Sequence, residues 1–393
     1  MEGVTNLPMR IWFHLVSAPE TLATPFLRVT ATYPHKELPR EFAPELGELR
    51  AYLPYQLVPQ LMAADTDEFL RVAPALLRES EFVELNCGCP SPTCVGKGAG
   101  SSLLKNADEF GTMIGRISRE LGPGRFAVKM RTGFQSEQEF STLIAPLSAL
   151  PLARLTVHGR TRPNRYTGMA RWDLIEEAAQ KVVAPLVASG DVVDDSSLQQ
   201  RLRVAPSVQH VIIGRGALRN PWIFEALRRR SHVSISFQHL RLAVLVLALL
   251  QELMATDPVK LFTLCKEGLF NQSCEHNVDR WLQVYRALAV AVWPAGHDHP
   301  DRPSEVSRAT LGRVKLVWNY LRSSLPAPFF APPPLRSGSL EGFLDGLTAA
   351  YDVLERPQYL QLCHRPEFDW LYSGEKKVKV VESTCKDLAD TPI

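Results

Sequence analysis

Short runs of β-branched and aliphatic residues recur along the first part of the chain, separated by longer stretches that suit helices. The runs cover residues 55–58, 82–85, 126–130, 155–158, 186–188 and 210–213, with a weaker one at 26–29. Their spacing of roughly 25 to 40 residues is typical of repeated βα units around a parallel sheet. Nearly every run ends in a polar or glycine-containing loop, where a barrel of this kind carries its chemistry. The sequence therefore predicts an α/β fold, a (β/α)8 TIM barrel.

The runs number seven, which is one strand short of a closed eight-stranded barrel. The chain opens directly on Met1-Glu2-Gly3-Val4-Thr5-Asn6, with no strand-forming run in front of it. An open barrel leaves two unpaired strand edges and exposes apolar core surface. We therefore expect the first strand to be truncated, with Met1 an internal methionine of a chain that begins roughly ten residues earlier.

Beyond residue 224 the pattern changes to long helical periodicity without strands, from about 239 to 323, with a break at 294–300. The proline-rich stretch 326–334 suits a stiff linker, and a basic run follows at 376–379. We expect a barrel domain over residues 1–235 and a C-terminal helical domain over 236–325. Residues 326–393 are expected to form a linker and an extension whose role the sequence does not indicate.

Charge and cysteine usage restrict the environment and the partners. Lysine and arginine number 44 against 42 acidic residues, for a net charge of +2, so an anionic partner must be met by a local basic patch. Seven scattered cysteines without a secretory segment predict a reducing, cytoplasmic location. The longest apolar run, 242–250, is too short to cross a bilayer and predicts a buried helix. We expect no membrane partner and a monomer.

The most informative motif is Asn86-Cys87-Gly88-Cys89-Pro90, which closes the strand-forming run at 82–85. It places the thiol of Cys89 at the carboxyl edge of the sheet, where a thiol can donate a proton to a substrate. Buried packing is the alternative, since cysteine is among the most buried residue types. Zinc is a further alternative with Cys87 and Cys94, but the spacing lacks a fourth ligand and a Cys-x-x-Cys knuckle, so no metal is expected.

Other polar residues close neighbouring strands. Lys129 follows three apolar residues, so its ammonium should face an anionic partner at the barrel mouth, and His158 ends the next strand, either there or as a structural histidine. Gly214 and Arg215 could cradle a phosphate where the last strand meets a helix, or form a turn with a solvated arginine. The glycine-rich stretch 96–101 lacks the context of a dinucleotide fingerprint and predicts a flexible loop over the site.

Five segments occur in the order found in one known family: 86–91, 98–104, 128–133, 157–161 and 213–218. Over roughly residues 1 to 325 the chain resembles the tRNA-dihydrouridine synthases, and the opening Met1–Asn6 resembles that family's first loop. The Cys-Gly-Cys-Pro variant resembles most the bacterial dihydrouridine synthase C subgroup, whose target is the D-loop uridine at position 16. This resemblance implies an oxidoreductase that reduces the C5–C6 bond of uridine in tRNA.

The resemblance also implies the cofactors and their residues. FMN would be the flavin and NADPH the electron donor, and Cys89 would be the catalytic proton donor. Asn86 would contact the base or the flavin. The residues that would bind the flavin are Met1, Glu2, Gly3, Gln60 (at the end of the third strand), Lys129, His158, Ser189, Gly190, Asp191, Gly214 and Arg215.

A basic stripe in the helical region is the expected tRNA contact. Arg308, Lys315 and Arg322 recur at seven-residue spacing and share one helix face, with Arg313 nearby. The corresponding family segment meets tRNA, whose target base must be extruded to reach a barrel mouth. An ordinary solvated helix face is the alternative.

The chain departs from the family pattern at one turn, and two alternative functions are also compatible with its sequence. Ser189-Gly190-Asp191 stands where the family usually has Asn-Gly-Asp or Asn-Gly-Glu, and serine has a shorter reach than asparagine. One alternative function is another FMN barrel oxidoreductase acting on a small molecule. The other is a tRNA-binding protein that has lost catalysis.

Overall fold

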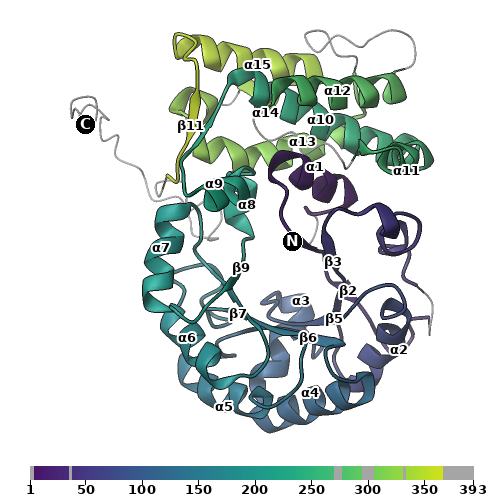
Figure 1. Ribbon diagram of the computed structural model, residues 1–393, viewed down its shortest axis with the longest axis vertical. Helices are drawn as coiled ribbons and strands as arrows, with labels where there is room; N and C mark the ends of the chain where they lie inside the picture. Colours follow the sequence, from purple (N-terminus) through teal and green to yellow (C-terminus); the bar gives the residue numbers. More distant parts are fainter. Residues whose placement is uncertain (1–3, 35–37, 270–276, 294–304, 331–332, 366–393) are drawn as a thin grey trace.

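A seven-stranded parallel sheet forms the centre of the computed structural model, which describes residues 4–34, 38–269, 277–293, 305–330 and 333–365 (Figure 1). Its order is β2-β4-β5-β6-β7-β8-β9, so the strands of this sheet pair in their order along the chain, with β3 left out. The strands are β2 (Leu27–Arg28), β4 (Gln60–Met62), β5 (Val83–Cys87), β6 (Phe126–Arg131), β7 (Arg154–His158), β8 (Leu186–Ser189) and β9 (His210–Ile212). This sequential parallel order with flanking helices confirms the predicted (β/α)8 class. Among the described residues β2 and β9 are the two edge strands of this sheet.

Helices follow the strands and cover the outside of the sheet (Figure 1). They are α2 (Thr66–Leu76), α4 (Ala107–Leu121), α5 (Phe140–Ile144), α6 (Trp172–Lys181) and α7 (Asp195–Val204), whereas α8 (Arg215–Arg219) and α9 (Ile223–Arg229) lie beside the helical region. In α4, the Asn106 side chain caps the first turn, and Gly122 with φ 88° ends the helix. Phe110, Ile114 and Ile117 are buried on one face of it, with the spacing of an amphipathic helix against a sheet.

The predicted strand at 55–58 is divided by proline. β3 (Gln56–Val58) pairs with β1 (Thr21–Ala23) in a separate two-stranded sheet, and β4 then continues from Gln60. Pro59 has no N–H to donate, which is why the ladder changes partner there. Gln60 therefore begins a strand, and the expectation that it ends one is wrong.

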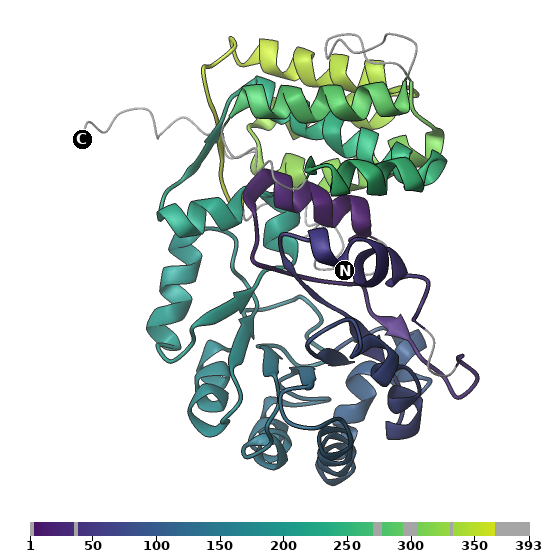
Figure 2. The same ribbon diagram turned by 45° about the vertical axis from the view of Figure 1, so that its right-hand side comes forward.

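A helix that the sequence analysis did not anticipate, α1 (Leu7–Ser17), lies between the sheet and the C-terminal helices (Figures 1 and 2). The side chain of Asn6 caps it by accepting from the N–H of Met9. All of its residues are buried, and Trp12 donates from its indole to the carbonyl of Ala243, 2.7 Å away. This helix therefore joins the sheet to the helical region.

The helical region comprises α10 (Phe237–Thr256), α11 (Pro258–Lys266), α12 (Val278–Val292) and α13 (Arg308–Leu321), as the periodicity predicted. α10 is long and apolar enough to cross a membrane by length and composition, but 78% of its most apolar window is buried inside the protein. It packs against α1, α12 and α13. The prediction that 242–250 forms a buried helix is confirmed.

The structure differs from the expected linker at residues 326–334. Residues Ala327–Phe330 form a 3-10 helix whose Phe329 is fully buried. After α14 (Pro333–Arg336), helix α15 (Leu340–Val353) stacks the ring of Tyr351 on Phe237, with centroids 4.2 Å apart. β11 (Leu360–Leu362) then pairs with β10 (Val233–Ile235). The buried ring of Phe329 and the stacked ring of Tyr351 therefore pack the chain after residue 325 onto the helical region. The domain boundaries at residues 235 and 325 stay a prediction.

Candidate active site

The strand register places the predicted polar residues on one face of the sheet. Asn86 on β5 is opposite Lys129 on β6, and His158 on β7 is opposite Ser189 on β8. Side chains two residues apart in a strand share a face, so Lys129 and Arg131 on β6 point the same way. The intervening Met130 is fully buried in the hydrophobic core. The sheet therefore presents a polar inner face at its carboxyl ends.

A buried carboxylate that the sequence analysis missed organises the base of this face. Glu84, fully buried on β5, accepts hydrogen bonds from Gln60 at 2.6 Å and from Arg154 at 3.0 and 3.2 Å. Thr156 adds a further bond at 3.2 Å. A buried charge is tolerated when it is paired and hydrogen-bonded in this way.

Lys129 lies two residues closer to the carboxyl end of the sheet than Glu84, and its surroundings shift its pKa. Burial lowers the pKa of the Lys129 ammonium, and the nearby cations Arg131 and Arg154 lower it further. The carboxylate of Glu84 opposes this effect by raising the pKa. Glu84, on the neighbouring strand, therefore favours the charged form of Lys129, although its ion pair is with Arg154.

Cys89 is held at the sheet edge by its backbone. The side-chain oxygen of Asn86 accepts from the N–H groups of Gly88 and Cys89, each at 3.0 Å, and the Cys89 carbonyl accepts from Ser101. The thiol is partly buried, whereas Cys87 is fully buried and burial raises its pKa. The glycine-rich stretch lies beside Cys89, because Ser101 donates to its carbonyl; the flexibility expected of this stretch stays a prediction.

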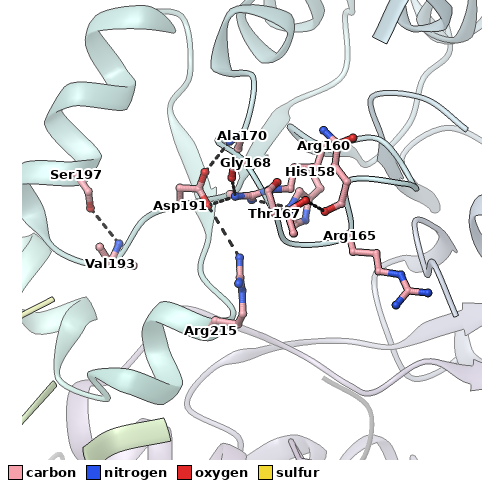
Figure 3. A network of polar contacts seen from close by, with 12 residues as sticks. His158, Arg160, Arg165, Thr167, Gly168, Ala170, Asp191, Val193, Ser197 and Arg215 are labelled. Carbon is pink, nitrogen blue, oxygen red and sulfur yellow. Dashed lines mark hydrogen bonds and ion pairs between the residues drawn. The ribbon is translucent and has the colours of Figure 1, made fainter. Parts of the chain in front are cut away.

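A cluster of cations lines the mouth beside Cys89. Arg131 donates to the carbonyls of Gly88, Thr161 and Arg165 at 2.7 to 3.0 Å, which joins the loops after β5 and β7. The carboxylate of Asp191 accepts from Arg160 at 2.6 Å and lies 4.0 Å from Arg215 (Figure 3).

Burial and mutual repulsion shift the pKa values of this cluster. Desolvation lowers the pKa of Arg131 to about 10, with Arg160 and Arg215 adding to the effect. The pKa of His158 falls well below its usual 6.5, because of burial first and the cations Arg131 and Lys129 next. Cations that lower one another's pKa indicate excess positive charge, which suits an anionic group such as a phosphate.

The turn at Ser189-Gly190-Asp191 has a backbone that requires glycine. Gly190 has φ +131°, and a Cβ there would lie 2.6 Å from the Cβ of Ala170. Asp191, also left-handed at φ 55°, binds the N–H of Ala170 through its carboxylate at 2.6 Å. At Gly214 a Cβ would meet nothing within 4 Å, which leaves open space beside Arg215.

Comparison with known proteins agrees with this arrangement. Residues 1–255 match the family model described as Dihydrouridine synthase (Dus). The chain belongs to the dihydrouridine synthase family. The tRNA-dihydrouridine(47) synthase of Coprinopsis cinerea is 37% identical over 168 residues, covering 40% of this chain and 25% of the relative. The similar protein of Homo sapiens is 33% identical over 181 residues, covering 45% of this chain and 27% of the relative.

The chain thus aligns with about a quarter of the length of these curated relatives. Among solved structures, morphinone reductase matches with a TM-score of 0.39 and 12% identity, over 59% of this chain and 83% of that one.

The helical region of this chain reaches the mouth of the barrel. α13 packs against α8, next to Arg215. Burial and the neighbouring phenol of Tyr166 raise the pKa of Tyr320 in the last turns of α13, while Arg215 lowers it. Tyr166 in turn lies under the Arg215 guanidinium, 4.4 Å from ring centroid to Cζ. Residues far apart in the sequence therefore form one rim.

The residues of the predicted basic stripe differ in exposure: two are exposed on α13, and two donate hydrogen bonds to the segment that follows α13. Arg308 and Arg313 are exposed on α13. Lys315 donates to the carbonyl of Ser337, and Arg322 donates to that of Phe330 at 3.0 Å while stacking on its ring. Lys315 and Arg322 thus also hold the segment after α13, a role that the heptad spacing did not indicate.

Met1, Glu2 and Gly3 lie outside the described residues. The residues that the sequence analysis did not assign to the site are Glu84, Arg131, Arg160 and Tyr166. Glu84 and Arg131 could have been found by strand alternation, since each lies two residues from a predicted site residue, Asn86 and Lys129 respectively. Tyr166 lies in an irregular loop, where periodicity gives no signal.

Proposed function

We propose that this chain reduces the C5–C6 double bond of a uridine in tRNA, with Cys89 as the proton donor. The observation that carries the proposal is the position of Cys89: its side chain is partly buried at the carboxyl edge of the sheet, and its backbone is held by Asn86 and Ser101. Family membership supports this reaction class. The names of the similar curated proteins, tRNA-dihydrouridine synthases, support tRNA as the substrate.

Cys89 would deliver its proton to C5 of the base. A thiol with an ordinary pKa of about 8.5 is mostly protonated at neutral pH, yet its thiolate is accessible after the transfer. The side chain of Asn86 fixes the Cys89 backbone, so the sulfur points from a constrained loop. The buried and uncharged His158 would offer hydrogen bonds without adding charge.

FMN is the proposed cofactor, and the residues of the mouth fit it. Arg215, with the open space at Gly214, would hold its phosphate in the excess positive charge described above. Gln60, Lys129 and His158 would hold its ring, with the turn Ser189-Gly190-Asp191 beside them. Bound FMN would supply the hydride for C6 and would be reduced again by NADPH; the names of the similar proteins specify NAD(P)+.

The target position within tRNA is a finer proposal. The Cys-Gly-Cys-Pro motif leads us to propose the D-loop uridine 16, as in the bacterial subgroup that it resembles. The similar curated proteins carry position 47 in their names. Location in the cytoplasm and a monomeric state belong to the same proposal.

Mapping dihydrouridine in tRNA from a deletion strain tests the reaction. We expect loss of one dihydrouridine, restoration by the native gene and by Cys94→Ala, and failure of Cys89→Ala to restore it. The purified protein should also be yellow. Restoration by Cys89→Ala would remove the proton-donor role, and an unchanged tRNA with a yellow protein would favour a small-molecule oxidoreductase. A colourless protein that binds tRNA would favour a homologue without catalysis.

A further inference from the structure

A second thiol lies next to the proposed proton donor. Cys94, in the short helix α3 (Pro92–Val95), has its sulfur 3.8 Å from the sulfur of Cys89. Sulfur atoms in a disulfide are about 2.05 Å apart, so a closure of under about 2 Å would join them. The proposed reaction leaves Cys94 without a task.

The two thiols have unlike surroundings. Cys94 is buried in a small apolar cluster with Met62 and Ala99. Cys89 is partly buried, and the guanidinium of Arg131, which donates to the adjacent Gly88 carbonyl at 2.7 Å, lies near enough that a charged Cys89 raises the pKa of Arg131. A nearby cation stabilises a thiolate, and thiolates are the form that oxidants attack. This asymmetry assigns Cys89 as the attacked sulfur and Cys94 as the sulfur that resolves the product.

We propose that Cys89 and Cys94 form a reversible disulfide in the presence of peroxide, which stops and protects the enzyme. The proposal rests on the function proposed above for Cys89. Its position in the loop supports it, because both residues lie within one short segment, 89–94, whose backbone needs no distant rearrangement to bring them together.

The chemistry balances with hydrogen peroxide as the oxidant. The Cys89 thiol is oxidised to a sulfenic acid, and the peroxide is reduced with release of one water. The Cys94 thiol then attacks that sulfur, the S–S bond forms, and a second water leaves with the sulfenic oxygen. A dithiol reductant reverses the reaction by exchange.

Two consequences follow for activity. While the disulfide exists, Cys89 has no proton to donate, so uridine reduction stops. Because the sulfenic acid is consumed, Cys89 does not proceed to the irreversible sulfinic acid. Without Cys94 the same exposure to peroxide should destroy activity permanently.

The experiment uses the purified full chain, treated with a small excess of hydrogen peroxide and then with dithiothreitol. Peptide mass spectrometry without reduction measures the Cys89–Cys94 crosslink, and tRNA reduction measures activity. In the native protein we expect the crosslink, at least tenfold loss of activity, and near-complete recovery on reduction. Cys94→Ala should keep its basal activity, form no crosslink, and fail to recover after peroxide.

Cys87→Ala is the matched control, since Cys87 is a neighbouring cysteine that ends β5 and is fully buried in the main hydrophobic core, apart from the cluster that holds Cys94. It should behave like the native protein. Absence of the crosslink in the native protein, or full recovery of Cys94→Ala, would overturn the inference. The crosslink is measured independently of activity, so a crosslinked but fully active enzyme would overturn the proton-donor role of Cys89 and, with it, the proposed switch.

Discussion

Gln60 donates a 2.6 Å hydrogen bond from its side-chain amide to the buried carboxylate of Glu84, which faces it across the β4–β5 pair. Its amide oxygen accepts at 2.6 Å from Asn86, which in turn holds the backbone of Cys89. A hydrogen-bonded chain therefore connects the buried base of the sheet with the loop that carries the thiol. Because every member has a partner, the chain fixes the orientation of both amides.

Glu84→Gln should strongly destabilise the protein. The substitution keeps the volume but leaves Arg154, whose side chain is only 12% exposed, without its counter-charge. Breaking a buried pair from one side costs about 3–5 kcal/mol. The free energy of unfolding from urea titration measures the effect.

Glu79→Gln is the control, because Glu79 pairs with Arg50 at 2.8 Å on the surface. An exposed pair contributes about 0–1 kcal/mol, so this variant should remain close to the native protein. Equal losses in the two variants would show that the Glu84 carboxylate does not balance buried charge.

The lowered pKa of His158 predicts that the free energy of unfolding decreases as the pH falls below 6.5. Its pKa in the folded protein lies well below the usual 6.5, so the unfolded chain binds a proton that the folded chain refuses. Between the two pKa values stability falls with decreasing pH, because protons favour the unfolded state. We expect the native protein to lose more stability than His158→Asn between pH 7.5 and roughly 5.5. An NMR titration of His158 with a midpoint at or above 6.5 would contradict this.

The sequence predicts the sheet well because strand periodicity and loop chemistry are local properties. The β5 to β9 strands fall on the expected runs, with ends shifted by a residue or two. Pro59 divides a strand for a local reason that was overlooked. By contrast, the packing of Phe329 and Tyr351 on the helical region depends on distant partners, which composition does not disclose.

The candidate site divides in the same way. Cys89 follows β5, His158 ends β7 and Lys129 lies near the carboxyl end of β6, so their placement at one edge could be predicted. The position of Tyr166 under Arg215 could not, because it joins an irregular loop to a different strand end. The buried Glu84 was missed although its period-two relation to Asn86 was visible in the sequence.

Arg308→Ala should weaken tRNA binding without affecting the fold. Arg308 is exposed at the start of α13, the helix that packs next to the barrel mouth. Each lost phosphate contact lowers the slope of log affinity against log salt by about 1. Filter binding over a salt series measures this slope.

Arg119→Ala on α4 is the control, since this exposed arginine lies on the barrel's outer helices, away from the helical region (Figure 1). Its slope should equal that of the native protein. If Arg308→Ala also leaves the slope unchanged, this end of α13 does not meet the tRNA backbone.

Alanine substitutions at two glycines of one loop distinguish the effect of backbone strain from the effect of displacing the Cys89 thiol. Gly98 and Gly100 both have positive φ, +76° and +64°, so alanine at either position costs about 1 kcal/mol of stability. A Cβ on Gly100 would lie 3.0 Å from the carbonyl oxygen and 3.2 Å from the Cβ of Cys89. A Cβ on Gly98 would meet only Ala64, at an ordinary 3.6 Å.

Gly100→Ala should therefore lower kcat for uridine reduction at least tenfold, because a misplacement of about 1 Å can cost as much as a hundredfold in rate. Gly98→Ala should lower the unfolding temperature by about as much as Gly100→Ala does, because both positions have positive φ. It should leave kcat within about twofold of the native value, since its Cβ displaces nothing near the sulfur of Cys89. Single-turnover kinetics with saturating tRNA, together with thermal unfolding, separate the two effects. Equal kcat values in the two variants would mean that the position of Cys89 does not limit the proton transfer.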